Sequence, residues 1–310
     1  MASVSFLDLG NTGALFAIIL AVGFVVGKMG FLSKATQTGL TNIVIYVTLP
    51  CTIINSFQVS YDPALIRNLG LTLFVAVCSQ AIGQAASVIF FRKQPHEQRS
   101  VLRYGMIVCN SGFFGLPVLY AVFGSLALPY GAIYLIPQRF AMWLLGVPLF
   151  DKDSQKKKSA VAKTFVHPAM IAVYVGLALM IVQKSLPTAI NTPVVALASC
   201  TMPLAMMLVG SILVDIKPSM LLDKNIYFYC LIRSALIPAL VFLLCLLLGF
   251  GGTVLHVSVL MAGMPAAVTT SLLALRYGAD ERLGSALIVI STITFFIMLP
   301  VWLAIFPLVP

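Results

Sequence analysis

The sequence predicts an all-α polytopic membrane protein of ten transmembrane helices, arranged as two inverted repeats of five. Three observations lead to this fold class: the composition, the number of long apolar runs, and the alternation of basic loops along the chain. Of the 310 residues, 60% are hydrophobic and 9% are charged, and the mean hydropathy is +1.05. A soluble core could not bury so much apolar surface, so a lipid bilayer is the expected solvent.

Ten apolar runs are long enough to cross a bilayer, which takes about 20 helical residues. The expected spans are residues 13–29, 41–57, 68–91, 101–122, 130–150, 167–183, 193–214, 226–248, 255–277 and 283–307. The first run has no basic leader of the kind that precedes a cleaved signal, so it is interpreted as a retained helix. Within it, Gly23 and Gly27 allow a neighbouring helix to approach closely. Asp280 and Glu281 suit the N-terminus of the tenth span.

The lysines and arginines are distributed unequally between the two sides of the membrane that these spans define. The loops after spans one, three, five, seven and nine, counted together with the span ends that border them, contain 15 of the 19, whereas the loops on the opposite side contain two. Because basic residues accumulate in cytoplasmic loops, both termini are expected outside the cytoplasm, in a multi-pass protein of the cell membrane. The net charge of +10 is thereby explained without a nucleic-acid partner.

The longest hydrophilic connection, residues 151–163, divides the chain into two five-span halves, residues 1–150 and 164–310. Its lysine cluster has two interpretations, a solvated cytoplasmic linker or a contact with anionic membrane lipid. Prolines recur at similar separations in spans two, four and five and in spans seven, nine and ten. An odd number of spans per half makes the second half enter from the opposite side, which is an inverted repeat.

Two spans are interrupted where a simple membrane helix would be continuous. Span four contains Cys109-Asn-Ser-Gly-Phe-Phe-Gly-Leu-Pro117, and span nine contains Gly263-Met264-Pro265. Proline has no N–H and crowds the carbonyl group four residues back, so the helix opens and its freed backbone groups need other partners. Broken helices at matching positions of two halves indicate the binding site of a secondary transporter.

Two other function classes compete with a transporter. An enzyme within the membrane would need paired acids, a serine–histidine couple or a metal cluster, and the residue pattern contains none, so neither enzyme activity nor a cofactor is expected. The six cysteines lie in apolar runs without a C-x-x-C pair and are interpreted as small buried hydrophobic residues. An anion channel or a membrane receptor that uses the same broken helices stays open as the alternative.

The candidate substrate-binding residues surround the two interruptions. They are Asn110, Ser111, Gly112 and Pro117 in span four, Arg139 in span five, and Pro265 and Thr269 in span nine. Half-helices that begin at Pro117 and Pro265 are expected to point their partly positive N-termini at the bilayer centre. Because no acidic residue lies well inside a span, the predicted substrate is a small organic anion, a carboxylate. A sodium site built from carboxylates is not expected, although carbonyl groups at the breaks could still bind sodium.

Two arginines lie inside spans, where a central charge costs about 3 kcal/mol or more. Arg139, near the middle of span five, either faces the substrate path or acts structurally, by binding carbonyl groups at helix ends or by extending into a water-filled cavity. Arg233 lies roughly 10 Å from the cytoplasmic end of span eight, at about 1.5 Å per residue, and is expected to extend to that interface in a structural role.

Several motifs, in order along nearly the whole chain, resemble the auxin efflux carrier family. They are Gly30-Phe-Leu-Ser-Lys34 and Leu49-Pro50 near the start, Asn110 to Pro117 in span four, and Pro265 to Ala274 with Leu299-Pro300 in spans nine and ten. The resemblance implies ten helices, with helices 4 and 9 crossing at their breaks. It further implies a scaffold bundle of helices 1, 2, 6 and 7, a moving transport bundle of the other six, and often a homodimer.

The resemblance also bears on the substrate. In that family an asparagine ahead of the crossover proline contacts the substrate carboxylate, and Asn110 occupies the matching position. Ala266 and Ala267 stand where plant auxin carriers typically have Gln-Gly. This departure favours a small organic acid over auxin.

The orientation is tested with single cysteines and an impermeant thiol reagent on intact cells. We expect Ser3→Cys to be labelled and Ser154→Cys to be protected, because the latter lies in the basic loop that the charge asymmetry places in the cytoplasm. Labelling of Ser154→Cys without labelling of Ser3→Cys would mean that the orientation is reversed.

Overall fold

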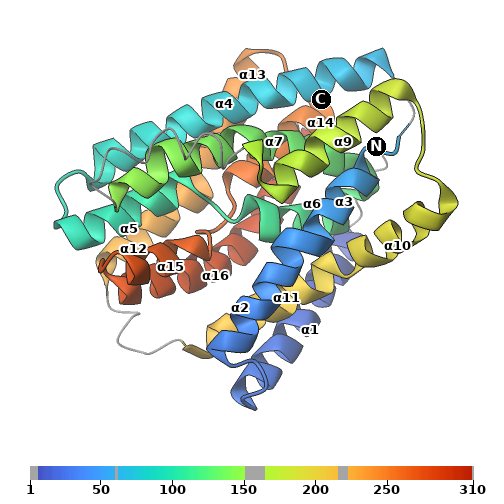
Figure 1. Ribbon diagram of the computed structural model, residues 1–310. Coiled ribbons are helices and arrows are strands. Elements are labelled where there is room, and N and C mark those ends of the chain that lie inside the picture. The colour runs from blue at the N-terminus through green and yellow to red at the C-terminus, as the bar shows by residue number, and fades with distance from the viewer. Residues whose placement is uncertain (1–5, 60–61, 151–164, 216–222, 309–310) are drawn as a thin grey trace. The chain divides into compact units, whose positions relative to one another are not determined.

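The computed structural model describes residues 6–59, 62–150, 165–215 and 223–308, and these ranges are almost entirely helical (Figure 1). The predicted linker at residues 151–163 lies outside them. The α-helices are α1 (Phe6–Lys28), α2 (Lys34–Ile43), α3 (Leu49–Ser56), α4 (Pro63–Phe91), α5 (His96–Ile107), α6 (Leu116–Phe123), α7 (Leu128–Ala141), α9 (Pro168–Val182), α10 (Thr188–Ser199), α11 (Thr201–Ile212), α12 (Lys224–Leu231), α13 (Ile237–Leu247), α14 (Gly252–Ala262), α15 (Thr269–Arg276) and α16 (Glu281–Ile305).

Six helical segments in the described ranges are long and apolar enough to cross a membrane, and each overlaps one predicted span. They are Lys34–Ser56, Pro63–Phe91, Ser125–Leu149, Thr188–Ile212, Lys224–Leu247 and Glu281–Leu308. The other four predicted spans contain shorter apolar helices, namely Ile18–Lys28, Ser111–Phe123, Pro168–Val182 and Gly252–Ala262. The chain is therefore an all-helical membrane protein with several membrane-spanning helices.

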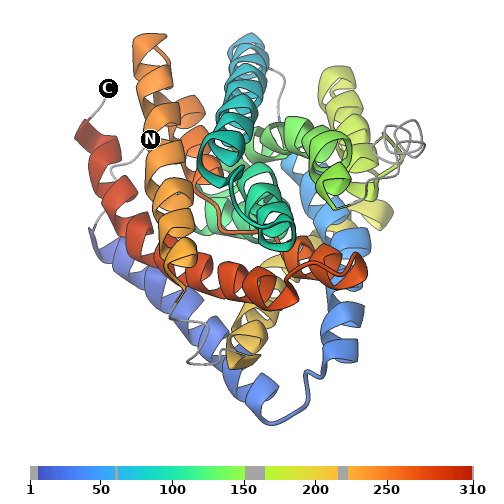
Figure 2. The same cartoon turned by 90° about the vertical axis from the view of Figure 1, so that its left-hand side faces the viewer.

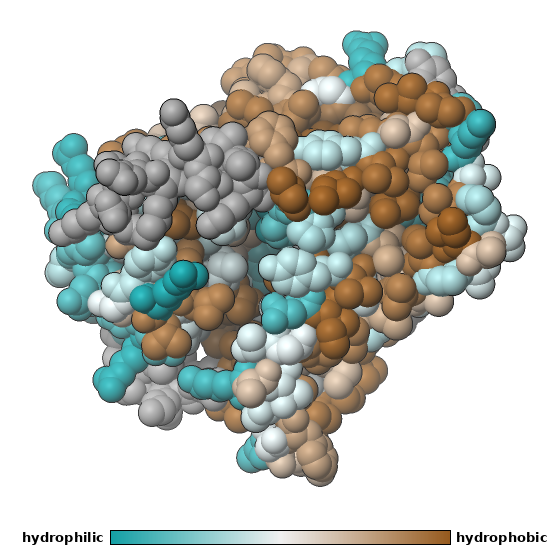
Figure 3. Space-filling view, viewed as in Figure 1, coloured by the Kyte–Doolittle hydropathy of each residue, from teal (hydrophilic) through white to brown (hydrophobic). Residues whose placement is uncertain are grey.

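The surface agrees with a membrane setting. Apolar side chains cover broad areas of the face shown in Figure 3. Helix α13, for example, exposes Leu240, Leu243, Leu246 and Leu247. Contiguous apolar surface of this kind is expected where lipid rather than water surrounds the helices.

The chain divides into two compact units. Unit 1 consists of Met1–Ile66, Gly112–Ala132 and His167–Ile216, and unit 2 consists of Arg67–Ser111, Ile133–Val166 and Lys217–Pro310. Predicted helices 1, 2, 6 and 7 fall in unit 1, and most of the other six fall in unit 2. The division follows the scaffold and transport bundles of the family resemblance except for Gly112–Ala132, which contains α6 and belongs to unit 1.

In unit 1, helices α1 and α11 pack backbone against backbone. A Cβ atom at Gly23 would lie 2.2 Å from the carbonyl oxygen of Met207, and one at Gly210 would lie 2.1 Å from that of Leu20. The close approach predicted from Gly23 and Gly27 is therefore confirmed, with α11 as the neighbouring helix.

Four π-helical segments each end two residues before a proline. They are Val44–Thr48 before Pro50, Ser111–Gly115 before Pro117, Met142–Gly146 before Pro148, and Ile232–Leu236 before Pro238. A π turn contains one extra residue, which moves the preceding carbonyl groups away from the proline ring. The chain passes Pro117 as continuous helix from Ser111 to Phe123. The prediction that a half-helix begins at Pro117 is therefore wrong.

In unit 2, the C-terminal helix α16 packs against several other helices. Helices α12 and α15 pack along it, and α13 packs along α14. Figure 2 shows α16 in red with α12 and α13 in orange beside it. The carboxylate of Asp280 accepts a hydrogen bond from the N–H of Leu283 at 2.9 Å and caps α16, which confirms the predicted acidic start of this helix.

The tight contact between α1 and α11 gives a stability prediction. Gly23→Ala should destabilise the protein by about 1–3 kcal/mol, because a methyl group there meets the backbone of α11 and the helices must separate. Gly39→Ala on α2 is the matched control, since a Cβ atom at Gly39 meets nothing within 4 Å. Thermal unfolding in detergent measures both variants. Equal melting temperatures would show that α1 and α11 are not packed this closely.

Candidate functional site

The two predicted helix breaks meet within unit 2. Helix α5 ends at Ile107, helix α14 ends at Ala262, and an extended stretch follows each. Cys109 and Ala266 in these stretches form an isolated antiparallel bridge. Beside it, the N–H of Asn110 donates to the carbonyl oxygen of Pro265 at 2.8 Å. We call these paired stretches, residues 106–111 and 261–269, the crossing.

Side chains from other helices hold the polar backbone groups of the crossing. The amide of Gln80 on α4 donates to the carbonyl oxygen of Ile107 at 2.9 Å, and the amide of Gln138 on α7 donates to that of Cys109. From α16, the hydroxyl oxygen of Ser291 accepts from the N–H of Ala266 at 3.0 Å. The helices that surround the crossing thus replace the hydrogen bonds that the broken helices lost.

Arg233 is the residue that the sequence analysis placed wrongly. Its side chain does not extend to the membrane interface but is buried, with 4% of its surface exposed. The Nε atom donates to the carbonyl oxygen of Met264 and the Nη1 atom to that of Met106, each at 2.9 Å. One guanidinium therefore connects both sides of the crossing. The depth of Arg233 in its span was the available signal, but depth alone does not show which way a side chain points.

Asn110 differs from every other polar residue of the crossing. Its backbone N–H is bonded to Pro265, and the residue is 6% exposed. Its carboxamide forms no hydrogen bond with any residue that the structure describes. The neighbouring Ser111 hydroxyl, in contrast, donates to the carbonyl oxygen of Met261 at 3.4 Å and also contacts the thiol of Cys109. The Asn110 amide is thus a nearly buried polar group without a hydrogen-bond partner among the described residues.

Thr269 begins α15, four residues after the carbonyl group that holds Asn110. Its hydroxyl oxygen lies 2.9 Å from that of Tyr104, which is fully buried on α5. No side chain caps the N-terminus of α15, so its first N–H groups have no side-chain acceptor. The N–H of Thr270 donates to the carbonyl oxygen of Ala267 at 2.9 Å, and this end of α15 places a partial positive charge beside the crossing.

Arg139 lies in the last turn of α7 and is half-buried. Its Nε atom is inaccessible and has no hydrogen-bond partner among the described residues, and Tyr104 is an electrostatic neighbour. The structural role that the sequence allowed for Arg139, hydrogen bonding to carbonyl groups at helix ends, is filled by Arg233 instead. Within the described ranges, Arg139 also forms no ion pair, so its charge is not neutralised by a carboxylate there.

The predicted site residues thus fall into two groups. Asn110, Ser111, Pro265 and Thr269 lie at the crossing in unit 2, and Arg139 lies in the same unit. Gly112 and Pro117 are buried and belong to unit 1, where α6 packs against α1 and α11.

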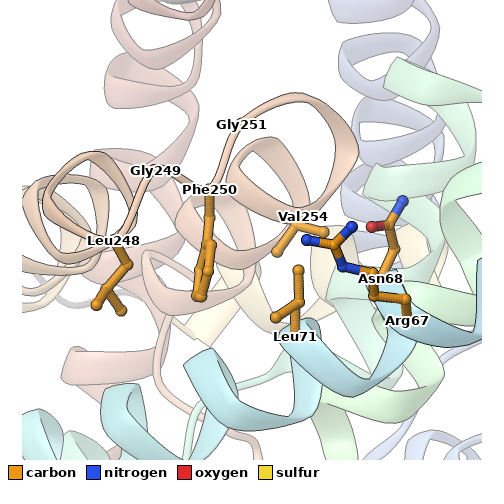
Figure 4. A pocket seen from close by; sticks show the side chains of 8 residues that line it. All are labelled: Arg67, Asn68, Leu71, Leu248, Gly249, Phe250, Gly251 and Val254. Atoms are coloured by element: carbon orange, nitrogen blue, oxygen red, sulfur yellow. The ribbon is translucent and has the colours of Figure 1, made fainter. Parts of the chain in front are cut away.

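A separate pocket of about 270 Å³ lies in unit 2, between the start of α4 and the turn that connects α13 with α14. In Figure 4, Arg67 and Asn68 stand on one side, and Leu248 and Phe250 stand on the other. None of the predicted site residues lines it. The crossing and this pocket are therefore distinct places in the fold.

An all-helical membrane protein in which two broken helices meet at a buried crossing has the construction of a membrane transporter. The chain belongs to the membrane transport protein family, whose model matches residues 14–303, and the resemblance to auxin efflux carriers is thereby confirmed. It is 25% identical over 297 residues to an uncharacterised transporter of Methanocaldococcus jannaschii, with 92% of this chain and 94% of the relative covered. It is 24% identical over 302 residues to an uncharacterised transporter of Methanothermobacter thermautotrophicus, with 95% and 98% covered. The protein is a transporter and not an enzyme.

Proposed function

We propose that this transporter moves a small organic anion, a carboxylate, by alternating access, with its substrate site at the crossing of helices 4 and 9. The observation that carries the proposal is the Asn110 carboxamide, which is nearly buried and has no partner among the described residues. A buried polar group without a partner is unfavourable by about 1–3 kcal/mol. A carboxylate that accepts from the amide N–H group would supply the missing partner.

The charge around the crossing supports an anion. The uncapped N-terminus of α15 contributes a partial positive charge, and Arg139 contributes a full one. The described residues place no carboxylate in a hydrogen bond at the crossing. We assign the substrate-binding role to Asn110, Ser111, Gly112, Pro117, Arg139, Pro265 and Thr269, as the sequence analysis predicts.

The proposal includes a topology and a movement. Ten spans form two inverted five-helix repeats in the cell membrane, with both termini outside the cytoplasm, and two copies of the chain associate as a homodimer. Unit 2 carries the crossing with Asn110 and moves relative to unit 1, which serves as the scaffold. The agreement between these units and the two bundles of the family supports this assignment.

Substitution of Asn110 tests the site. Asn110→Ala should weaken carboxylate binding to purified protein by about 1.5–3 kcal/mol, since a hydrogen bond to a charged group is lost. Asn110→Asp should weaken it further, because the new carboxylate repels an anion. Asn42→Ala, an exposed position on α2, is the matched control. If Asn110→Ala folds normally and binds as tightly as the parent, the site is elsewhere. A parent protein that prefers cations would show that the predicted sign is wrong.

Substitution of Arg139 tests whether its positive charge attracts the substrate from a distance. Arg139→Gln should weaken a dicarboxylate more than a monocarboxylate of similar size, because a second negative charge gains more from the same positive potential. Arg92→Gln, at an exposed position just after α4, is the control for net charge. Calorimetric titration of both ligand types measures the difference. Equal losses for the two ligands would separate Arg139 from the substrate path.

Carrier and channel are distinguished in proteoliposomes. A carrier that alternates access should show saturable uptake and counterflow, in which unlabelled substrate inside accelerates entry of labelled substrate. Flux that does not saturate and lacks counterflow would assign the same site to a channel.

A further inference from the structure

We propose that Arg233 is a tethered cation of the crossing. Its guanidinium takes the carbonyl oxygen atoms that would otherwise be available to a free cation such as sodium, so the fold and the ligand site need no sodium. The statement about the fold stands on the contacts of Arg233 alone. The statement about the ligand rests on the proposed function.

The crossing is where a cation is needed. Helices α5 and α14 both end there, and each C-terminus carries about half a negative charge on its unpaired carbonyl groups. In transporters with broken helices, such carbonyl groups at half-helix C-termini coordinate the coupling cation. The two helix ends therefore create the same electrostatic demand in this chain.

Arg233 meets that demand from a single side chain. Two of its N–H groups donate to the carbonyl groups of Met106 and Met264, one from each side of the crossing, at 2.9 Å. The residue is 4% exposed and forms no ion pair among the described residues. Its charge is thus stabilised by backbone carbonyl groups, which are also among the ligands of bound metal cations.

Three further carbonyl groups of the crossing are also engaged. Those of Ile107, Cys109 and Pro265 accept hydrogen bonds from the amides of Gln80 and Gln138 and from the N–H of Asn110. A sodium ion would have to displace these donors as well as the guanidinium to collect enough oxygen ligands. These five carbonyl groups of the crossing are therefore satisfied without a metal ion.

Two features of the local sequence bring Arg233 to this place. It lies in the π-helical segment Ile232–Leu236 that precedes Pro238, where an extra residue widens the turn. On the opposite side, Gly83 of α4 leaves space. A Cβ atom there would lie 2.9 Å from the carbonyl oxygen of Met106 and 4.0 Å from Nη1 of Arg233. Both features serve the contact between the guanidinium and the carbonyl group.

The tethered charge has a consequence for substrate choice. Arg233 compensates the partly negative ends of α5 and α14, whereas the partly positive end of α15 has no side-chain cap. The net potential at the crossing is then positive without any bound ion. Arg233 would act on the substrate through the backbone of the crossing, as a positioning residue.

Chemical rescue tests the tethered cation without any substrate. Arg233→Ala should lower the melting temperature of the detergent-solubilised protein by about 5 °C or more. Millimolar methylguanidinium should restore most of that loss, whereas methylurea, its neutral counterpart of similar shape, should not. Arg92→Ala is the matched control, because Arg92 is exposed and its loss should neither destabilise the protein nor create a site for methylguanidinium. Rescue by both compounds, or by neither, would overturn the proposal.

A second comparison decides the matter if Arg233→Ala does not fold. Arg233→Lys keeps the charge and Arg233→Met keeps only the length, so the lysine variant should be the more stable of the two. The parent protein should melt at the same temperature in sodium chloride and in N-methylglucamine chloride of equal concentration. A methionine variant as stable as the parent, or a parent stabilised by sodium, contradicts the assignment.

The effect of Arg233 and of sodium on ligand binding is measured in a separate experiment. Carboxylate affinity of the parent should be equal in sodium and in N-methylglucamine, and Arg233→Gln should lower it about tenfold or more, with partial recovery in Arg233→Lys. If the parent binds no carboxylate in either salt, the proposed function fails while the rescue experiment still decides the role of Arg233. If carboxylate binding requires sodium, the proposal that Arg233 replaces a free cation is wrong, while the proposed function stands.

Discussion

The construction of this protein depends on one constraint, the need to satisfy backbone polar groups in a helix that opens inside the membrane. Helices α5 and α14 both stop in mid-segment, and water is not available there to accept or donate hydrogen bonds. The side chains of Gln80, Gln138, Arg233 and Ser291 take over, each from a different part of unit 2. The crossing and its supports are therefore one compact body, so a movement of unit 2 would carry the crossing without breaking these bonds.

The side chains that stabilise the crossing are different from the one that is proposed to bind the substrate. The backbone of Asn110 is fixed through Pro265, while its carboxamide is left without a partner among the described residues. A side chain that also held the fold could not change partners when a ligand arrives, because the loss of a buried hydrogen bond would oppose binding. Since Arg233 and the glutamines hold the fold, the proposed role of Asn110 in binding does not conflict with a structural one.

The number and position of the apolar helices could be predicted from the length and spacing of apolar runs, whereas the direction of individual side chains could not. The apolar runs located the membrane-length helices, and the glycine pair in α1 correctly indicated a close helix contact. The break of the fourth span was expected but misplaced, because Pro117 is accommodated by a π turn and the helix opens instead at residues 108–110. The roles of the two arginines within spans could not be told apart for a similar reason. Depth in a span is a count along the sequence and does not give the direction of a side chain, and the carbonyl-binding role considered for Arg139 belongs to Arg233.

A neutral amide at the centre of the site also suits a transporter that must release what it binds. A fully buried arginine paired with a carboxylate substrate would hold it through two charge-assisted hydrogen bonds in a low dielectric, and release would be slow. One hydrogen bond from Asn110 contributes about 1.5–3 kcal/mol, which discriminates between ligands without trapping them. The two full positive charges belong to other residues. Arg233 is hydrogen-bonded to carbonyl groups, and Arg139 is half-buried on α7. In the proposed site, the charges would select the sign of the substrate, and the amide would set how tightly it is held.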